Sequence, residues 1–316
     1  MLRSISVEGL ENPVSSLIIG SDYFTPDKQE LVNEVIEQYL TVGGNTIDTA
    51  FIYGGGQSEK AIGQWVDRNS SNRERLQIWT KGGHPNKNGP TINQKDLTEQ
   101  IKISLERLKV DQVDLYALHR DDPTLPVGKI LEWLNQLVED GYMKTFGGSN
   151  WSTKRLEEAN NYAKKHRMRG FSFSSPNLSL AKAKEPYWPD CVSLDREDII
   201  WHEQTQLPVL SWSSQARGFF TGKFNKAEQS NQELVRVFYN DANWKRYERA
   251  QKLAEQKGMT TIEIALAYVL NQSFPTAAII GPRNYKEIVS CANGASINLS
   301  TQELEWLNLE VDFIES

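Results

Sequence analysis

The sequence has few cysteines and no metal-binding motif. Cys191 and Cys291 are its 2 cysteines; they are far apart and form no CxxC pair. This count excludes a small scaffold held by disulfides, and we expect unreactive thiols in a reducing, cytoplasmic location. The 4 histidines show no metal-ligand spacing, so we expect no bound metal.

Long apolar runs and a basic excess are also missing. No run approaches the roughly 20 apolar residues of a membrane-spanning helix, and the opening MLRSISVEGLENP lacks the apolar centre of a signal peptide. A net charge of -6 argues against nucleic-acid binding but leaves room for a local phosphate pocket. We therefore expect neither a membrane nor a nucleic acid as a partner. Oligomeric state cannot be read from the sequence.

What the sequence does contain is a regular alternation of two kinds of segment. Segments with helical periodicity, such as LVNEVIEQYL and LTEQIKISLERL, separate short β-rich runs. These runs are continuously apolar, as in strands buried on both faces. There are eight of them: SSLIIG, NTIDTA, LQIWTK, VDLYALH, MKTFGGSN, FSFSS, PVLSWSS and TAAIIG.

Eight such units predict a parallel (β/α)8 barrel, an α/β fold, as a single domain over residues 1–316. A doubly wound dinucleotide fold would need GxGxxG after its first strand, where this sequence has Gly20, Ser21 and Asp22. We expect long loops at residues 181–200 and 218–243, at the carboxyl end of the strands. The segment TQELEWLNLEVD predicts a terminal helix with packing residues Leu304, Leu307 and Leu309.

The stretch Asn45 to Gly63 is the most informative part of the chain. An apolar run ends at Asp48, Tyr53 follows a short turn, and three glycines then open a loop before a helical segment. A carboxylate at the point where a strand becomes a loop is typical of barrel active sites. Later strands end in further polar or aromatic residues: Lys81, His119, Asn150, Ser175, Trp212 and Arg283.

These motifs together resemble the aldo-keto reductase family, and the resemblance covers nearly the whole chain. The matching segments are DTAFIYGGGQSEKAIG, WTKGG, VDLYALHRDD, GGSNWS, VLSWSSQARGFFTGK and IIGPRN. The resemblance implies a catalytic tetrad of Asp48, Tyr53, Lys81 and His119. In it Tyr53 donates the proton, Asp48 holds Lys81, and His119 orients the substrate oxygen. We expect the Lys81 ammonium to lower the pKa of Tyr53. Each residue alone also has an ordinary structural reading; the ordered set favours catalysis.

The resemblance also implies a nicotinamide cofactor, with NADP(H) favoured and NAD(H) as the alternative. Ser149 and Asn150 match the family's carboxamide contacts, and Trp212 matches the aromatic that stacks on the nicotinamide ring. SSQARG matches the pyrophosphate loop, and Arg283 is the candidate for a 2′-phosphate. The full set of expected cofactor residues is Gly20, Ser21, Asp48, Ser149, Asn150, Ser175, Trp212, Ser213, Ser214, Gln215, Ala216, Arg217, Gly218, Lys223, Gly281, Pro282, Arg283 and Glu287.

The chain departs from the family pattern at the cofactor segments. Ser175 stands where a Gln is usual, and Ser290 and Cys291 replace the Glu-Asn that usually meets adenine. Glu287 disfavours a nearby 2′-phosphate and suits a 2′-hydroxyl. For the substrate, a small carbonyl compound or sugar, we expect contacts from Tyr23, Tyr53, His119, Trp151 and Trp188.

Two other functions compete with a carbonyl reductase. One is a cofactor-binding regulatory subunit on the same scaffold, since channel β-subunits resemble this family. The other is a barrel hydrolase that uses Asp48 with Asp121 or Asp122, but it gives Tyr53 and Lys81 no role.

Overall fold

Eight parallel strands close into a barrel in the computed structural model, which describes residues 2–313. Around the barrel the order is β10-β3-β4-β5-β6-β7-β8-β9, so the predicted fold is confirmed. The strands are β3 (Leu17–Gly20), β4 (Thr46–Asp48), β5 (Gln77–Gly82), β6 (Val113–Leu118), β7 (Met143–Ser149), β8 (Ser174–Ser175), β9 (Val209–Ser211) and β10 (Thr276–Ile280).

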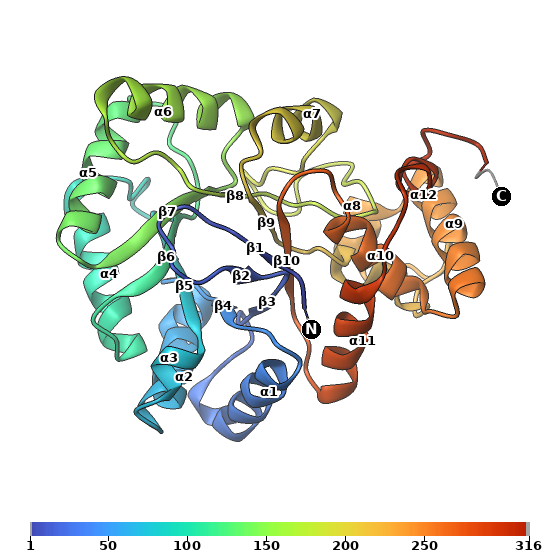
Figure 1. Ribbon diagram of the computed structural model, residues 1–316, viewed down its shortest axis with the longest axis horizontal. Helices are drawn as coiled ribbons and strands as arrows, with labels where there is room; N and C mark the ends of the chain where they lie inside the picture. The colour runs from blue at the N-terminus through green and yellow to red at the C-terminus, as the bar shows by residue number, and fades with distance from the viewer. Residues whose placement is uncertain (1, 314–316) are drawn as a thin grey trace.

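Helices surround the barrel, and a further group lies to one side of it, at the right of Figure 1. The α-helices are α1 (Gln29–Thr41), α2 (Gln57–Asp67), α3 (Asn72–Arg75), α4 (Gln94–Leu108), α5 (Val127–Glu139), α6 (Thr153–His166), α7 (Arg196–Thr205), α8 (Gln232–Phe238), α9 (Asp241–Lys257), α10 (Thr261–Leu270), α11 (Tyr285–Ser296) and α12 (Thr301–Leu307). Short 3₁₀ helices are η1 (Pro26–Lys28), η2 (Tyr53–Gly56) and η3 (Ala216–Thr221).

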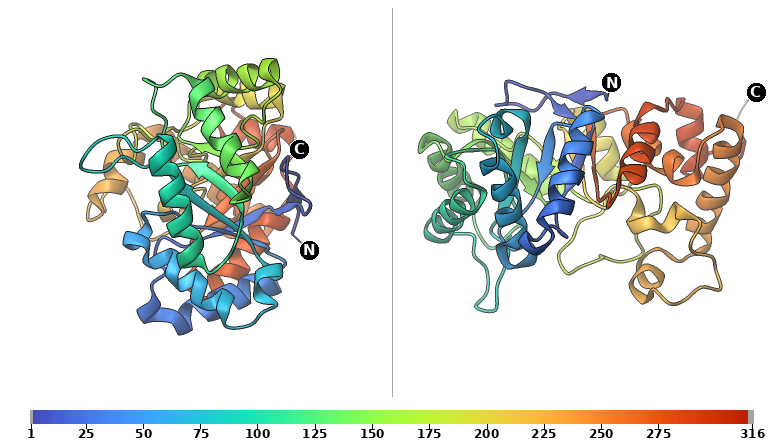
Figure 2. Two further views of the ribbon diagram at one scale, coloured as in Figure 1. Left: turned by 90° about the vertical axis from the view of Figure 1, so that its left-hand side faces the viewer. Right: turned by 90° about the horizontal axis from the view of Figure 1, so that it is seen from below.

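An N-terminal hairpin that the sequence did not predict closes one end of the barrel. Its strands, β1 (Ser4–Ile5) and β2 (Val14–Ser15), pair antiparallel, and Val7 and Val14 join the apolar cluster inside the barrel. Figure 2 shows the hairpin at the end opposite the long loops. The open end of the barrel is therefore the end where the β-strands finish, which is where barrels of this kind place their active sites.

The two predicted long loops are partly helical, which corrects that expectation. Helix α7 begins at Arg196, within residues 181–200. Helix α8 and the start of α9 lie within residues 218–243. Asp195 caps α7, Asn231 caps α8 and Asn240 caps α9, each accepting a backbone N–H with its side chain.

The C-terminal helix is shorter than predicted. It ends at Leu307, which is buried, while Leu304 is partly buried. Leu309 lies beyond the helix, with φ at 69°. Trp306, which the prediction omitted, is buried with Leu307. Among residues 2–313 no helix has the length and apolar character needed to cross a membrane.

Candidate active site

Lys81, Asp48 and Tyr53 form one hydrogen-bonded chain at the open end of the barrel. Lys81 Nζ, on β5, donates to Asp48 Oδ1 at the end of β4, to Thr49 O at 3.0 Å and to the Tyr53 hydroxyl at 3.2 Å. The Lys81 and Asp48 side chains are only 4% and 5% exposed. The ammonium is therefore held between a carboxylate and a phenol, away from bulk water.

The loop that carries Tyr53 depends on its glycines. Gly54, Gly55 and Gly56 have φ values of 57°, 64° and 90°, a region that side-chain-bearing residues rarely adopt. At Gly56 a Cβ would also lie 2.4 Å from the Arg107 guanidinium carbon. The three glycines thus turn the chain from Tyr53 directly into α2.

A buried ion pair supports this loop from beneath. Glu59 is fully buried; it accepts from Thr80 Oγ1 at 2.7 Å and from Arg107 Nη1 at 3.0 Å. Arg107 also donates to Phe51 O at 3.0 Å. Because Phe51 lies two residues before Tyr53, these contacts fix the backbone that aims the phenol.

Hydroxyl groups hold the other side of the tetrad. The Ser21 hydroxyl donates to Asp48 O at 2.7 Å and lies 2.7 Å from the Ser58 hydroxyl, which in turn lies 2.8 Å from that of Thr49. Ser21 is fully buried. The sequence predicted that Ser21 contacts the cofactor. In the structure its hydroxyl is already bonded to Asp48 O and therefore positions Asp48.

His119 lies at the end of β6 beside Tyr53. The two rings are 5.7 Å apart between centroids and nearly perpendicular, and His84 packs against His119 at 5.0 Å. The Nδ1 atom of His119 is buried without a hydrogen-bond partner in the described part of the chain. A buried polar atom of this kind indicates a ligand or water that would satisfy it.

The electrostatics of the site differ from the expected pattern at Tyr53. Burial and the Asp48 carboxylate raise the pKa of Tyr53 well above its ordinary value, instead of lowering it. Burial also raises the pKa of Asp48 to about 6, opposed by Lys81, and lowers the pKa of Lys81. Burial and nearby cations keep His119 neutral by lowering its pKa. At neutral pH Tyr53 is thus a protonated phenol, suited to donating a proton.

Asn150, after β7, connects the tetrad to the aromatic side of the site. Its Nδ2 donates to His119 O at 3.3 Å, and its Oδ1 accepts from Trp212 Nε1 and from Val192 N, each at 3.2 Å. Both ends of the amide are thus already bonded within the protein. A cofactor carboxamide would have to share or replace one of these bonds.

The residues that remain at this end fit a nicotinamide. Ser175 Oγ, at the end of β8, is fully buried and has no partner among residues 2–313. The Ser149 hydroxyl donates to Ser175 O at 3.1 Å. The ring of Trp212 is half-buried after β9, which suits stacking against a planar ring. An orphaned hydroxyl beside a half-buried aromatic face is consistent with the predicted cofactor position.

The predicted pyrophosphate loop, residues 213–218, has an unusual backbone. Ser213, Ala216, Arg217 and Gly218 have φ values of 48°, 47°, 51° and 87°. Three of them, Ala216 to Gly218, are consecutive left-handed residues, so the chain turns sharply here and leaves the extended direction of β9. The Ser214 hydroxyl, in contrast, is used internally, because it donates to Ile279 O at 2.8 Å.

The side chains around this loop face outward or join neighbouring segments. Gln215 Oε1 lies 3.8 Å from the buried Cys291 thiol, and Lys223 is exposed. The Arg217 guanidinium lies over the rings of Tyr187 and Trp188, at 4.7 Å and 5.1 Å from their centroids. Arg217 thus ties the phosphate loop to the loop that follows β8.

The loop after β10 forms the third expected cofactor segment. Gly281 has open space around it, and the exposed Arg283 stacks over the Tyr23 ring at 4.4 Å. Tyr23 donates its hydroxyl to Pro282 O. The Glu287 carboxylate accepts from Arg283 N at 2.8 Å. Tyr23 therefore packs against the expected cofactor segment, and its contact with substrate stays a prediction.

The structure separates the two tryptophans expected at the substrate mouth. Trp151 is 1% exposed, packs on Phe171 and donates Nε1 to Arg120 O at 3.2 Å, so it lies in the core and its contact with substrate stays a prediction. Trp188 is 41% exposed and lies 5.9 Å from Trp212 between ring centroids. Trp188 remains available at the mouth.

Sequence reasoning missed Arg120, which lies within the site. It is buried, and its Nη1 donates to His119 O at 2.8 Å. Its place in the sequence directly after His119 could have indicated a role in the site. The two carboxylates that follow, Asp121 and Asp122, suggest instead an ordinary surface ion pair. Asp121 pairs instead with Arg155 at 3.0 Å. That pairing, with Asp48 held by Lys81, engages both members of the Asp48–Asp121 pair named for the hydrolase alternative.

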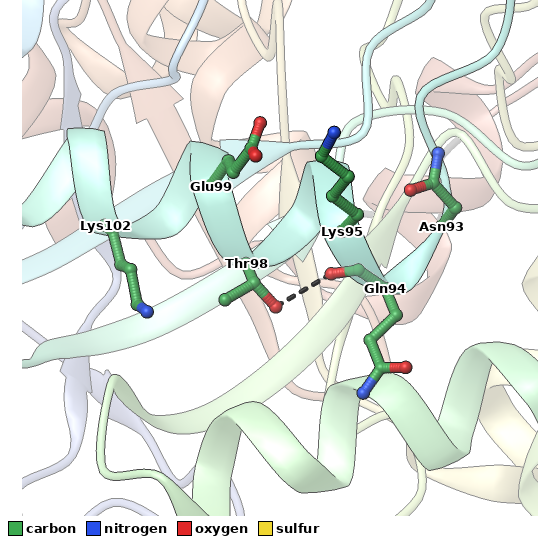
Figure 3. A pocket seen from close by; sticks show the side chains of 6 residues that line it. All are labelled: Asn93, Gln94, Lys95, Thr98, Glu99 and Lys102. Atoms are coloured by element: carbon green, nitrogen blue, oxygen red, sulfur yellow. Dashed lines mark hydrogen bonds between the residues drawn. The ribbon is translucent and has the colours of Figure 1, made fainter.

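Two surface hollows lie outside the tetrad. One, of ≈ 510 Å³, borders the site through Asn150, Val192 and Asp121. The other, of ≈ 580 Å³, is shown in Figure 3; it runs along α4, where the Thr98 hydroxyl donates to Gln94 O at 2.7 Å. No tetrad residue lines this second hollow. Among residues 2–313 no group of three or more His, Cys, Asp or Glu residues is arranged to hold a metal.

Comparisons with known proteins agree with this geometry. A sequence model described as "Aldo/keto reductase family" matches residues 16–308. The uncharacterized oxidoreductase YrpG of Bacillus subtilis is 27% identical over 307 residues, covering 93% of this chain and 91% of that protein. A putative voltage-gated potassium channel subunit beta of Schizosaccharomyces pombe is 28% identical over 282 residues, covering 82% and 77%. In fold, a glycerol dehydrogenase from Gluconobacter oxydans superposes with a TM-score of 0.77 at 23% identity, over 96% of this chain and 94% of that chain.

Proposed function

This chain belongs to the aldo/keto reductase family, and from that premise we propose that it reduces aldehydes or ketones to alcohols with NAD(P)H. The observation that carries the proposal is the buried chain from Asp48 through Lys81 to the Tyr53 hydroxyl. A reduced nicotinamide, when bound, supplies the hydride. Tyr53 donates the proton to the carbonyl oxygen.

Each tetrad residue has a role that follows from its contacts. Lys81 stabilises the phenolate that Tyr53 becomes after donation, since its ammonium lies 3.2 Å from the oxygen. Asp48 keeps Lys81 charged and in place. His119, being neutral, can donate a hydrogen bond to the substrate oxygen without competing for its proton.

NADP(H) is the favoured cofactor, with NAD(H) as the alternative. Arg283 is exposed, and among residues 2–313 its guanidinium forms no ion pair, so it can meet a 2′-phosphate. The Glu287 carboxylate already accepts a hydrogen bond from the Arg283 backbone N–H. This bond makes Glu287 less suited to bind the 2′-hydroxyl of NAD(H). The proposed substrate is a small carbonyl compound or sugar. The two free, buried thiols support the proposed cytoplasmic location.

The test is to titrate NADPH, then NADH, into the purified protein while following nicotinamide fluorescence, and then to add a panel of aldehydes and sugars. Saturable binding and carbonyl-dependent loss of the reduced-cofactor signal are expected. If neither NADPH nor NADH binds, the proposal is contradicted.

A second function, a cofactor-binding regulatory subunit, is favoured by the similarity to a putative channel β-subunit. Binding of NADPH without turnover across a wide carbonyl panel would favour this function. The complete Asp48–Lys81–Tyr53 chain favours the enzyme.

A further inference from the structure

Arg120 is a buried cation at the active site that lacks an anionic partner. It is 7% exposed, and within residues 2–313 no carboxylate forms an ion pair with it. Its neighbour Asp121 pairs with Arg155. Burial of a charge without a partner is unfavourable, so a guanidinium kept in this state indicates a ligand that supplies the anion.

The contacts of Arg120 place its charge on the substrate side of the tetrad. Nη1 donates to the carbonyl oxygen of His119, the preceding residue. The main chain of Arg120 is fixed by the hydrogen bond from Trp151 Nε1. Burial raises the pKa of the Cys191 thiol, and the nearby Arg120 guanidinium opposes that rise. The guanidinium therefore lies between His119 and the loop that follows β8.

The neighbouring charges leave Arg120 uncompensated. Asp48 and Lys81 neutralise each other, and His119 is neutral. Asp190, in the loop near Cys191, is exposed and forms no ion pair with Arg120. The charge of the exposed Asp22 acts on Asp48 and Tyr53, but within residues 2–313 Asp22 forms no ion pair with Arg120.

The phosphates of the cofactor do not provide the missing anion. Arg120 follows β6, which is separated from β9 by β7 and β8, and from β10 by β5, β4 and β3. The candidate phosphate segments follow β9 and β10. This position favours a partner on the substrate.

We infer that Arg120 binds an anionic group on the substrate, so that the enzyme prefers aldehydes or ketones that carry a carboxylate near the carbonyl. This inference rests on the proposed reductase function. The planar guanidinium matches the two oxygens of a carboxylate, and Nη1 is already oriented by its bond to His119. A phosphate shares this chemistry, and the assay separates the two.

The test compares matched substrates with and without the charge: 3-carboxybenzaldehyde with its methyl ester, and glyceraldehyde 3-phosphate with glyceraldehyde. Charge-assisted hydrogen bonds predict that the carboxylate raises kcat/KM by about 10- to 100-fold, mainly through KM. Arg120→Met should abolish this preference, so that the ratio of kcat/KM between the acid and its ester falls to about 1. Arg120→Lys should retain part of it, because it keeps the charge but loses the planar fork.

Lys154→Met is the matched control, because it removes the same charge from an exposed position in the ≈ 510 Å³ hollow. It should leave the carboxylate preference intact. If it weakens the preference as much as Arg120→Met does, long-range attraction explains the effect and the inference fails. The inference also fails if Arg120→Met slows charged and uncharged substrates equally, since Arg120 would then act on the tetrad. A preference for the phosphorylated aldehyde alone would overturn the carboxylate assignment.

A binding measurement separates this inference from the proposed reduction. Benzoate and benzamide are titrated by calorimetry into the NADPH-treated protein and into Arg120→Met. Tighter binding of benzoate that Arg120→Met removes would support the anion site even if no aldehyde is turned over. Equal binding of the two compounds would overturn it.

Discussion

Lys81→Met should destabilise the protein strongly, because it leaves the Asp48 carboxylate buried without its partner. The two side chains are 4% and 5% exposed. Removing one member of such a pair costs about 3–5 kcal/mol. With about 2.1 cal/mol/K of unfolding entropy per residue over 316 residues, the melting temperature should fall by about 4–8 °C.

A second variant tests the origin of this loss. In Lys81→Met/Asp48→Asn no unpaired charge remains, so the double variant should recover at least half of the lost melting temperature at pH 8. Lys81 lowers the pKa of Asp48, which is about 6 when the pair is intact. Without Lys81 that pKa rises further. The carboxyl becomes neutral as the pH falls, and the two variants should converge toward pH 5.

The assay is thermal denaturation followed by circular dichroism from pH 5 to pH 8. Lys109→Met is the control, since it breaks the exposed Lys109–Asp67 pair and should shift the melting temperature by less than about 2 °C. If Lys81→Met and the double variant melt together at every pH, the buried-pair reasoning is refuted.

Three further predictions concern pH and the cofactor. Because burial raises the pKa of Asp48 to about 6, its carboxylate is lost as the pH falls from 7 to 5, and kcat for reduction should fall with it; a flat profile would contradict this. Arg283→Met should weaken NADPH binding by about 10- to 100-fold and NADH binding little, measured by fluorescence titration; equal weakening would exclude the 2′-phosphate role. Ser175→Ala should leave the melting temperature nearly unchanged, because Oγ has no partner in the described chain, but should weaken NADPH binding by about 2- to 10-fold; unchanged binding would show that Oγ does not contact the cofactor.

The barrel could be predicted from sequence because its strands are buried on both faces. Most of them therefore appear as apolar runs, although β8, Ser174–Ser175, is formed by two buried serines. The β1–β2 hairpin, Ser4–Ile5 with Val14–Ser15, has no apolar run and falls outside the strand–helix alternation. Only the closed barrel creates the apolar end that Val7 and Val14 cover.

The tetrad was expected from the resemblance to the aldo-keto reductases, whose motifs the chain carries in order, and the structure brings Asp48, Tyr53 and Lys81 into one hydrogen-bonded chain. The direction in which a side chain points after a strand could not be predicted from the sequence. Asn150 has φ at 60°, and this left-handed turn directs Trp151 into the core. The raised pKa of Tyr53 was also unpredictable, since it depends on how completely the phenol is buried. Arg120 could not be recognised from the sequence, because its burial and the pairing of the adjacent Asp121 with Arg155 appear only in the folded chain.

The most direct test of the central claim is Tyr53→Phe, which removes the proposed proton donor and keeps the ring. Proton transfer by a positioned group contributes about 10²- to 10⁴-fold, so carbonyl reduction should fall by that factor. NADPH affinity, measured by fluorescence titration of the same preparation, should change by less than about 2-fold, because Tyr53 contacts Lys81 and not the predicted cofactor segments. Near-normal reduction by Tyr53→Phe would show that another group supplies the proton and would contradict the account.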